Sequence, residues 1–273
     1  MKIADKVAIV TGGGGGIGGA LAAKLAQHGA RVVVADLDAQ LASAVADQIN
    51  TARCGAAASA GADVSDTAQI QRLIDLAENE FGLVDMYFAN AGITGAAGLD
   101  VTEADWDRSI DVNLRAHIRA AQLLVPRWVE RGEGYFVSTA SAAGLLTQLG
   151  SATYTVTKHA AVGFAEWLNI TYGDQGVRVS CLCPMGVNTK LLYSGGQSGH
   201  PLGELATRAV TTAGEVLEPE VVADAVLEAI DDERFLILPH SAVLEMYRQK
   251  GADYDRWLRG MRRYQRMLKG DAQ

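Results

Sequence analysis

The sequence contains very little cysteine: three residues, Cys54, Cys181 and Cys183, in a chain of 273. They are too few and too unevenly spaced to form a disulfide framework. The pair in the C-x-C at 181–183 has no nearby histidine or second cysteine pair that could complete a metal site. We therefore expect no bound metal and three small, buried cysteine side chains.

Long apolar runs and an excess of positive charge are also missing. No apolar stretch approaches the roughly 20 residues that cross a bilayer, and the N-terminus lacks the order of charged, apolar and small residues found in a secretory signal. The net charge of −8 disfavours nucleic acid as the main partner. These absences predict a cytoplasmic protein without membrane insertion.

The length and composition are those of one globular α/β domain, which we expect to span residues 1–273. Apolar residues make up 49% of the chain, enough for a full core. Short β-branched runs that end in turn residues predict strands. They lie at 6–11, 31–36, 83–92, 134–139, 177–184 and 235–239, with a weaker candidate at 56–63.

Helical patterns lie between these runs, at 18–28, 38–53, 65–80, 102–130, 151–172 and 219–230. Ser65 and Thr102 are suitable N-cap residues, and Pro219 suits a first helical turn. Strands and helices alternate, and the strands are apolar throughout. We therefore predict a single doubly wound, Rossmann-type parallel sheet of about seven strands with helices on both faces, plus a C-terminal helical extension.

Five consecutive glycines, Gly12 to Gly16, separate the first predicted strand from the first predicted helix. In a doubly wound sheet this turn meets the pyrophosphate of a dinucleotide, and a Cβ here would hold the phosphates away from the backbone and the helix N-terminus. The alternative is a tight turn or linker without a ligand. It is disfavoured because the run lies between two well-patterned elements.

Asp36 ends the second predicted strand, eighteen residues after Gly18. A carboxylate there can accept hydrogen bonds from the adenosine ribose hydroxyls, whereas it would repel a 2′-phosphate. A helix-capping role is the alternative, but Asp38 is better placed for the cap. Because no arginine or lysine lies between residues 11 and 19, the sequence favours NAD over NADP.

Several motifs follow one another at the ends of these elements. They are T-G-x-x-x-G-x-G at Thr11–Gly18, N-A-G at Asn90–Gly92, and Ser141 followed by Y-x-x-x-K at Tyr154–Lys158. Together they resemble the short-chain dehydrogenase/reductase family, over about residues 6–239. The resemblance implies an oxidoreductase acting on CH–OH groups. Gly13, Gly14 and Gly15 occupy variable positions of the family pattern.

Tyr154 and Lys158 are four residues apart on a predicted helix and therefore share one face. A fixed ammonium and the positive nicotinamide of the cofactor would both favour the phenolate. Lowering the phenol pKa by about three units requires roughly 4 kcal/mol, much of which one close cation can supply. The resemblance makes Tyr154 the acid/base for the substrate hydroxyl and gives Lys158 a hydrogen bond to the nicotinamide ribose.

Two further catalytic residues follow from the resemblance. Ser141, on the loop after the fifth predicted strand, would hold the substrate oxygen by a hydrogen bond. Ser138 is its competitor, but it belongs to the strand end. Asn113, in the long helix predicted over 102–130, matches the asparagine that bends that helix and holds a water in a proton relay to Lys158; the alternative is a polar residue with no functional role.

The cofactor contacts expected from the resemblance are spread over the carboxyl ends of the strands. Met185 stands where the family often has glycine, which puts the local turn in doubt and introduces a flexible side chain beside the nicotinamide or the substrate. The complete set comprises Gly12, Gly14, Gly15, Gly16, Ile17, Gly18, Asp36, Leu37, Asp63, Val64, Asn90, Ala91, Gly92, Tyr154, Lys158, Pro184, Gly186, Val187 and Thr189.

Residues near 190–213 occupy the place of the family's substrate-covering lid and contain several glycines. Apolar side chains surround the expected reaction centre, and Arg208 is the only arginine in the two stretches concerned. We therefore expect a small-molecule substrate, a neutral secondary alcohol or ketone that is fairly bulky, aromatic or alicyclic. The predicted substrate pocket comprises Ser141, Leu146, Tyr154, Met185, Leu191 and Leu192.

The C-terminal extension, 240–273, is basic and aromatic. Between Arg248 and Lys269 it has eight basic residues against two acidic ones, with aromatic and apolar residues at helical spacing. We favour packing against the parent subunit or a neighbour over closure of the pocket, and either over binding to an anionic membrane or acidic partner. The family often forms tetramers, so we expect a homo-oligomer, a tetramer or dimer.

Other functions compete with an NAD-dependent dehydrogenase or ketone reductase. One is a catalytically silent dinucleotide-binding regulatory protein; the intact set of Asn113, Ser141, Tyr154 and Lys158 argues against it. A methyltransferase would have no use for Tyr-x-x-x-Lys. A dehydrogenase of a small or acyl-linked hydroxy substrate is the remaining alternative.

Overall fold

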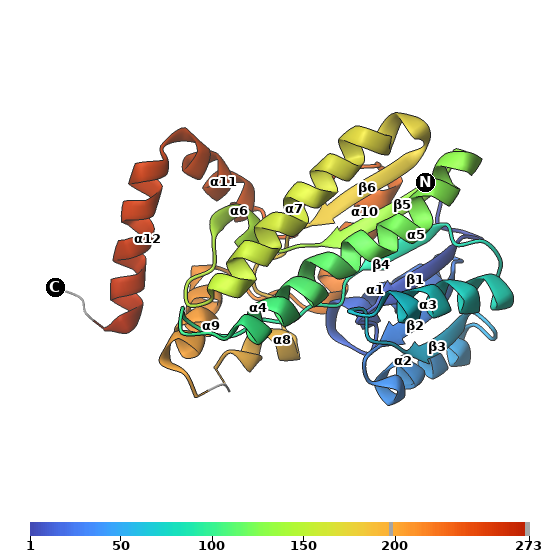
Figure 1. The fold of residues 1–273 in the computed structure, drawn as a ribbon, viewed down its shortest axis with the longest axis horizontal. Coiled ribbons are helices and arrows are strands. Elements are labelled where there is room, and N and C mark those ends of the chain that lie inside the picture. Colours follow the sequence, from blue (N-terminus) through green and yellow to red (C-terminus); the bar gives the residue numbers. More distant parts are fainter. Residues whose placement is uncertain (197–198, 271–273) are drawn as a thin grey trace.

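The centre of the computed structural model, which describes residues 1–196 and 199–270, is a seven-stranded sheet (Figure 1). All neighbouring strands run parallel, in the order β3-β2-β1-β4-β5-β6-β7. The predicted doubly wound sheet is confirmed. The strands are β1 Val7–Thr11, β2 Arg31–Asp36, β3 Ala57–Gly61, β4 Met86–Ala89, β5 Gly134–Thr139, β6 Val177–Leu182 and β7 Leu236–Ile237.

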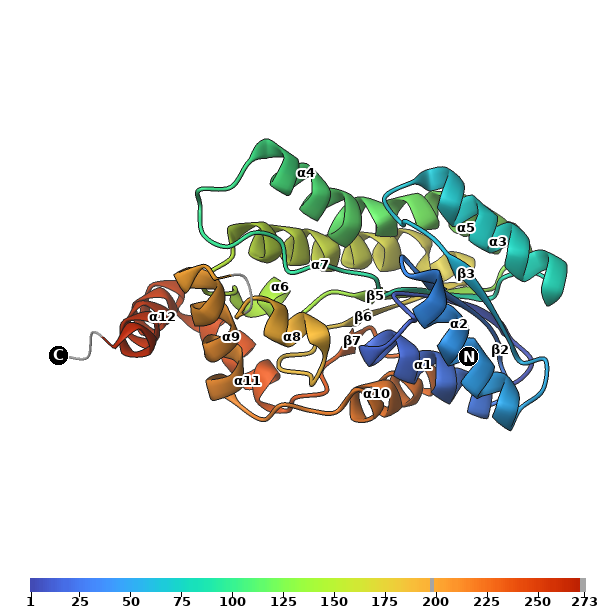
Figure 2. The ribbon, with the colours of Figure 1, turned by 90° about the horizontal axis from the view of Figure 1, so that it is seen from below.

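Helices cover both faces of the sheet, because strands that are apolar on both sides must be buried on both (Figure 2). One layer contains α1 Gly16–Gln27, α2 Ala39–Ala52 and α10 Pro219–Asp231, whose apolar side chains share a core with Val10 and Val34. The opposite layer contains α3 Thr67–Glu80, α5 Ala116–Arg131 and α7 Ala152–Tyr172, packed on Ile9 and Phe136.

The strand order reverses between β1 and β4, so the connections that follow these two strands lead away in opposite directions and leave a crevice at their carboxyl ends. Thr11 and Asn90 hold these two ends together. The Thr11 hydroxyl donates to Phe88 O at 3.0 Å, and Asn90 Nδ2 donates to Thr11 O at 3.0 Å. The glycine run begins directly beyond this clasp, so a rigid connection sets its position.

Two details of the predicted helices are wrong. Asp66, not Ser65, caps α3, because its carboxylate accepts the backbone N–H of Ala68 at 2.8 Å. The helix expected over 102–130 is divided into α4 Glu103–Ile110, a π-helical turn η1 Asp111–Arg115, and α5. Thr102 caps α4 in a reciprocal capping box with Asp105, as its position predicts.

The region after β6 contains more helix than the sequence pattern indicated. It includes α8 Lys190–Ser194 and α9 Pro201–Ala213. Earlier in the chain, the short α6 Ala143–Leu146 follows β5, and the 3-10 turn η2 Gly173–Gln175 connects α7 to β6. Residues 197–198 of the predicted lid lie outside the described residues.

The C-terminal extension forms α11 Ala242–Ala252 and α12 Tyr254–Lys269. Helix α12 lies at the end of the molecule beside α9, far from β1–β3 (Figures 1 and 2). Leu268 is buried against Leu205 and Ala209 of α9. The expected packing of the tail against its own subunit is thus present, and residues 271–273 of this extension lie outside the described residues.

Cysteine burial differs from the expectation at one position. Cys181 and Cys183 are buried in and beside β6, but Cys54 is exposed in the turn before β3. Within residues 1–196 and 199–270, no helix is long and apolar enough to cross a membrane, and no group of three or more acidic, histidine or cysteine side chains has an arrangement suited to a metal.

Candidate active site

Helix α7 positions Tyr154 and Lys158 in its first two turns. Ser151 begins this helix by accepting the backbone N–H of Tyr154 at 3.2 Å. One helical turn separates the two side chains, and Lys158 Nζ lies 5.6 Å from the centroid of the Tyr154 ring. The structure therefore places the ammonium beneath the phenol, on one face of the helix.

Lys158 is buried without a carboxylate partner among the described residues, and its Nζ donates to Thr139 O at 2.9 Å. Burial lowers the pKa of Lys158 from its ordinary value of 10.5 to about 8. Thr139 in turn donates its hydroxyl to Asn90 Oδ1 at 3.2 Å. The ammonium is thus fixed to the carboxyl ends of β5 and β4.

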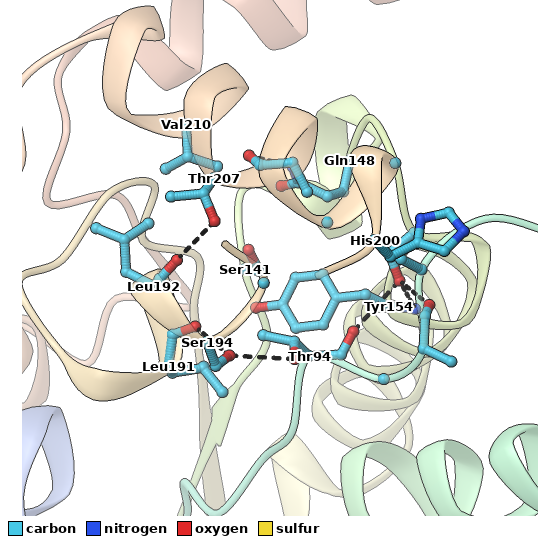
Figure 3. A pocket seen from close by; sticks show the side chains of 18 of the residues that line it. Thr94, Ser141, Gln148, Tyr154, Leu191, Leu192, Ser194, His200, Thr207 and Val210 are labelled. Carbon is cyan, nitrogen blue, oxygen red and sulfur yellow. Dashed lines mark hydrogen bonds between the residues drawn. The ribbon is translucent and has the colours of Figure 1, made fainter. Parts of the chain in front are cut away.

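Tyr154 reaches from α7 into a cavity, where its hydroxyl and the Ser141 side chain lie toward each other (Figure 3). Burial raises the pKa of Tyr154 above its ordinary value of 10, and a hydrogen bond with Ser141 acts in the opposite direction. Ser141 Oγ accepts the N–H of Ala143 at 3.1 Å, which fixes the serine at the start of α6.

Ser138 has a different environment from Ser141. It is fully buried in β5, where its hydroxyl lies 2.9 Å from His117 Nδ1. Burial, followed by the charge of Lys158, lowers the pKa of His117 to about 3. Ser138 therefore belongs to a neutral buried pair, while Ser141 lines the cavity, as its loop position predicts.

Asn113 lies in the π-helical turn between α4 and α5 and is completely buried. Its Oδ1 accepts the N–H of Ile93 at 2.9 Å, and its Nδ2 donates to Ile93 O at 2.9 Å and to Thr157 Oγ1 at 3.1 Å. A Cβ built on Gly92 would lie 3.3 Å from Asn113 Oδ1 and 3.4 Å from Lys158 Nζ. The asparagine and the lysine therefore converge at Gly92.

The glycines before α1 leave open space over the start of that helix. No side chain caps α1, its first turn contains no acidic residue, and a Cβ on Gly15 would meet nothing within 4 Å. Gly18 is packed instead: a Cβ there would lie 2.1 Å from Gly12 O. Bare N–H groups at an uncapped helix N-terminus fit a pyrophosphate.

Gly14 is less free than its variable position in the motif indicated. Its N–H donates to Asp36 Oδ2 at 2.9 Å, and a Cβ on Gly14 would lie 2.7 Å from the Leu41 Cβ. The other oxygen of Asp36 accepts the N–H of Asp38 at 3.1 Å. Asp38 itself caps α2, as its position predicts, so Asp36 is not needed for that cap.

A cavity of about 630 Å³ lies beside Asp36 at the carboxyl ends of the strands. Among the described residues, its charged lining consists of Asp36, Asp63, Asp107, Asp111 and a single cation, Arg108. This balance is unfavourable for a 2′-phosphate. The predicted cofactor contacts on this wall are Gly12, Asp36, Leu37, Asp63, Val64, Ala91 and Gly92.

The remaining predicted cofactor contacts lie around this cavity and not in its wall. Gly15 and Gly16 border a neighbouring surface cavity, Ile17 packs on the core beneath α1, and Asn90 clasps β1. A Cβ on Gly16 would lie 3.0 Å from Thr189 Cγ2, which brings the loop after β6 to the helix N-terminus. Val187, just before it, is buried and pairs with Leu217 in an isolated bridge.

His240, which follows β7, holds the turn around Met185 by two hydrogen bonds. Met185 N–H donates to His240 Nδ1 at 3.2 Å, and His240 Nε2 lies 3.0 Å from Gly186 O. Pro184 O accepts the N–H of Ala142 at 2.8 Å. Residues 184–186 are therefore clamped at the backbone, so the Met185 side chain is the part that can change its conformation.

The cavity in front of Tyr154, which we call the catalytic pocket, has a volume of about 300 Å³ and a mostly apolar wall. Of the predicted pocket residues, Ser141, Tyr154, Met185, Leu191 and Leu192 line it. Leu146 does not; it points into a second cavity on the other side of Met185. Leu146 therefore lies outside the catalytic pocket, because α6 turns its side chain away from Tyr154.

Sequence reasoning missed several residues of the catalytic pocket: Thr94, Gln148, His200, Thr207 and Val210 (Figure 3). Three of them come from the predicted lid. Thr94 Oγ1 lies 3.3 Å from Ser194 Oγ, which joins the two sides of the pocket, and Thr207 donates to Leu192 O at 3.2 Å, which joins α9 to α8. None of them belongs to a sequence motif. Thr94 lies just after Asn90–Gly92, and His200, Thr207 and Val210 lie in the predicted lid 190–213, so these positions could have indicated a place near the substrate.

The family model described as short chain dehydrogenase matches residues 6–197. The 1-deoxy-11-beta-hydroxypentalenate dehydrogenase of Streptomyces exfoliatus is 35% identical, over 88% of this chain and 85% of that protein. The cyclohexanol dehydrogenase of an Acinetobacter species is 31% identical, over 89% and 95%. A short-chain dehydrogenase/reductase from Burkholderia phymatum, solved in complex with NAD, has a TM-score of 0.84 and 32% identity, with coverage of 93% and 96%.

Proposed function

The chain belongs to the short-chain dehydrogenase/reductase family and is an oxidoreductase of alcohols or ketones, and we propose that it interconverts a neutral, bulky secondary alcohol and its ketone with NAD(H). The observation that carries the proposal is the convergence of three side chains on one cavity. Tyr154 and Ser141 line the catalytic pocket, and Lys158 lies behind the Tyr154 ring. A hydroxyl bound there meets a proton acceptor and a hydrogen-bond donor together.

The chain's cofactor is NAD in this proposal. When bound, NAD supplies the hydride acceptor for oxidation and, as NADH, the hydride donor for reduction. The uncapped start of α1 accommodates the pyrophosphate, and Asp36 accepts hydrogen bonds from the adenosine ribose. The four carboxylates around a single arginine in the adjoining cavity disfavour NADP. The NAD-bound relative from Burkholderia phymatum supports this assignment.

Tyr154 accepts the substrate hydroxyl proton during oxidation and returns it during reduction. Burial opposes the phenolate, so the enzyme must stabilise that charge by fixed neighbours. Ser141 provides one hydrogen bond, and the Lys158 ammonium provides the cation. Because its pKa is about 8, Lys158 stays largely protonated at neutral pH. Asn113 completes the proposed relay by positioning a water that exchanges protons with Lys158.

The substrate class follows from the wall of the catalytic pocket. Leu191, Leu192, Val210 and Met185 line it, and Arg208 does not. A neutral alicyclic or aromatic alcohol buries its ring there, whereas a small hydroxy acid finds no arginine or lysine among the described lining residues to pair with its carboxylate. The named cyclohexanol dehydrogenase relative supports an alicyclic substrate. We propose that α8 and α9 act as the lid over this pocket.

A panel of alcohols tests the proposal. With NAD, the enzyme should oxidise cyclohexanol and an aryl secondary alcohol, followed by the absorbance of NADH, at a kcat/KM well above that for lactate. Rates confined to lactate and other small hydroxy acids would overturn the substrate class. Binding of NADH without turnover of any member would instead favour a silent dinucleotide-binding protein. The cytoplasmic location, the single domain over 1–273 and the homo-oligomer stay predictions from the sequence.

A further inference from the structure

A second cavity lies behind the catalytic pocket, between α6, α9, α11 and α12. It has a volume of about 380 Å³, and we call it the tail cavity because both helices of the C-terminal extension line it. The size is within the range of small-molecule sites, about 300–1,000 Å³. Its principal apolar lining residues are Leu146, Met185, Val210, Met246, Trp257 and Met261.

The two cavities share part of their walls. Gln148, Met185 and Val210 line both, so the boundary between them includes these three side chains. The end of the Met185 side chain lies against Gly214, where a Cβ would be 2.7 Å from Met185 Cε. Met185 has an unbranched, flexible side chain on a backbone clamped by His240. A change of its rotamer alters this boundary without moving the main chain.

The chemistry of the tail cavity suits an uncharged apolar group. Tyr264 is the only ionisable side chain among the described residues that line it. Its hydroxyl is already engaged, because it donates to Ala209 O at 2.8 Å and lies 2.7 Å from Thr212 Oγ1. Three methionines and a tryptophan form much of the remaining wall. Such a surface adapts to the shape of a ring system, and the other polar side chains that line it, Thr147, Gln148 and Gln249, carry no charge.

We propose that the substrate has two apolar parts, with the carbinol carbon beside Tyr154 and a second ring or ring system in the tail cavity. This inference rests on the proposed function and extends it to the distal half of the substrate. It gives Met185 a role as the movable boundary and Leu146 a role in the distal site. It also assigns α11 and α12 a part in substrate recognition, in addition to their packing against the rest of the subunit.

Two alcohols of different length distinguish the two cavities. Cyclohexanol fits within the catalytic pocket, whereas 4-cyclohexylcyclohexanol must extend past Met185. Ala213 lines the tail cavity and not the catalytic pocket, so Ala213→Phe fills the distal site alone. We expect this variant to lower kcat/KM for 4-cyclohexylcyclohexanol at least tenfold and to leave cyclohexanol within twofold. Ala68→Phe, at an exposed alanine of α3 outside both cavities and outside the lid, is the matched control and should change neither.

Binding can be followed without turnover through Trp257, which lines the tail cavity. In the presence of NADH, 4-cyclohexylcyclohexanol should shift the tryptophan emission to shorter wavelength, and cyclohexanol should not. The shift should disappear in Trp257→Phe. In Ala213→Phe, the concentration of 4-cyclohexylcyclohexanol that gives half of the shift should rise at least tenfold. Equal behaviour of the two alcohols in the wild type, or an unchanged shift in Ala213→Phe, would overturn the distal site. Failure to oxidise any alcohol would refute the proposed function, and the emission titration would still decide the distal site.

Discussion

Replacing the buried lysine of the site should make the protein more stable while it destroys activity. Lys158 is buried, and its pKa of about 8 lies well below the ordinary 10.5. The difference corresponds to about 3 kcal/mol by which the fold disfavours the ammonium relative to the neutral amine. Lys158→Met removes that penalty but also the hydrogen bond to Thr139 O, worth about 1 kcal/mol. The expected net gain at pH 7 is therefore about 2 kcal/mol.

The pH dependence of stability gives a sharper form of the same prediction. Between about pH 8 and 10.5 the unfolded chain keeps the proton on this lysine, whereas the folded chain has released it. The unfolded state thus binds more protons than the folded state. Because of Lys158, the wild-type free energy of unfolding therefore increases with pH across this window. Lys158→Met should lack this contribution, which amounts to about 3 kcal/mol in total.

Urea denaturation at a series of pH values from 7 to 10.5 measures both effects. Lys2→Met, which removes an exposed lysine, is the control and should follow the wild-type curve. Activity with cyclohexanol should fall by at least a hundredfold in Lys158→Met. A variant that is less stable than wild type at pH 7 and has the same slope would refute the reasoning that burial of the ammonium strains the fold.

Three other perturbations test separate parts of the structure. The double variant Asp36→Ala/Gly15→Arg should raise the ratio of kcat/KM for NADP to kcat/KM for NAD at least tenfold. Removing a like charge and adding a cation each contribute about 1–2 kcal/mol in favour of the 2′-phosphate. An unchanged ratio would contradict the placement of the ribose. His117 is buried neutral with a pKa of about 3, so stability is lost as pH falls below about 6.5. His117→Gln should reduce this loss between pH 6 and 4 by about 1.4 kcal/mol per pH unit in urea denaturation, and an equal slope would argue against a neutral buried imidazole. Thr102→Ala should cost about 1 kcal/mol by removing the cap of α4, with Thr102→Ser close to wild type; equal stability of the alanine variant would exclude the cap.

Gly14 and Gly15 differ in the structure in a way that the sequence motif does not show. The motif alone treats Gly14 and Gly15 as equivalent variable positions. In the structure, a Cβ on Gly14 would collide with Leu41 and Asp36, whereas Gly15 faces open space in an extended conformation. A contact between β2, α2 and the glycine loop causes this difference, and a linear pattern contains no information on it.

The fold and the catalytic cluster could be predicted because they depend on local periodicity and on short spacings. Apolar strands alternating with helices predict the parallel sheet, and a four-residue spacing is enough to place Tyr154 and Lys158 on one face. The π-helical turn at Asn113 was not predictable from periodicity, because the side chain's bonds to Ile93 and Thr157 accompany a local change of helical pitch.

The substrate side of the site was harder to predict because distant segments meet there. Leu146 is close to Ser141 in sequence, yet α6 turns its side chain into the tail cavity. Val210 and Thr207 enter the catalytic pocket only because α9 folds back over it. The tail cavity itself requires α6, α9 and the C-terminal extension together. Such contacts between segments about 100 residues apart have no signature in a single sequence.

Turnover by Tyr154→Phe is the most direct test of the proposed mechanism. The substitution removes one hydroxyl from the catalytic pocket and leaves the ring above Lys158. We predict that oxidation of cyclohexanol falls by at least a thousandfold while NADH still raises the melting temperature as it does in wild type. Tyr247→Phe, an exposed tyrosine of α11, is the control and should keep full activity. Wild-type turnover by Tyr154→Phe would contradict the assignment of Tyr154 as the acid/base.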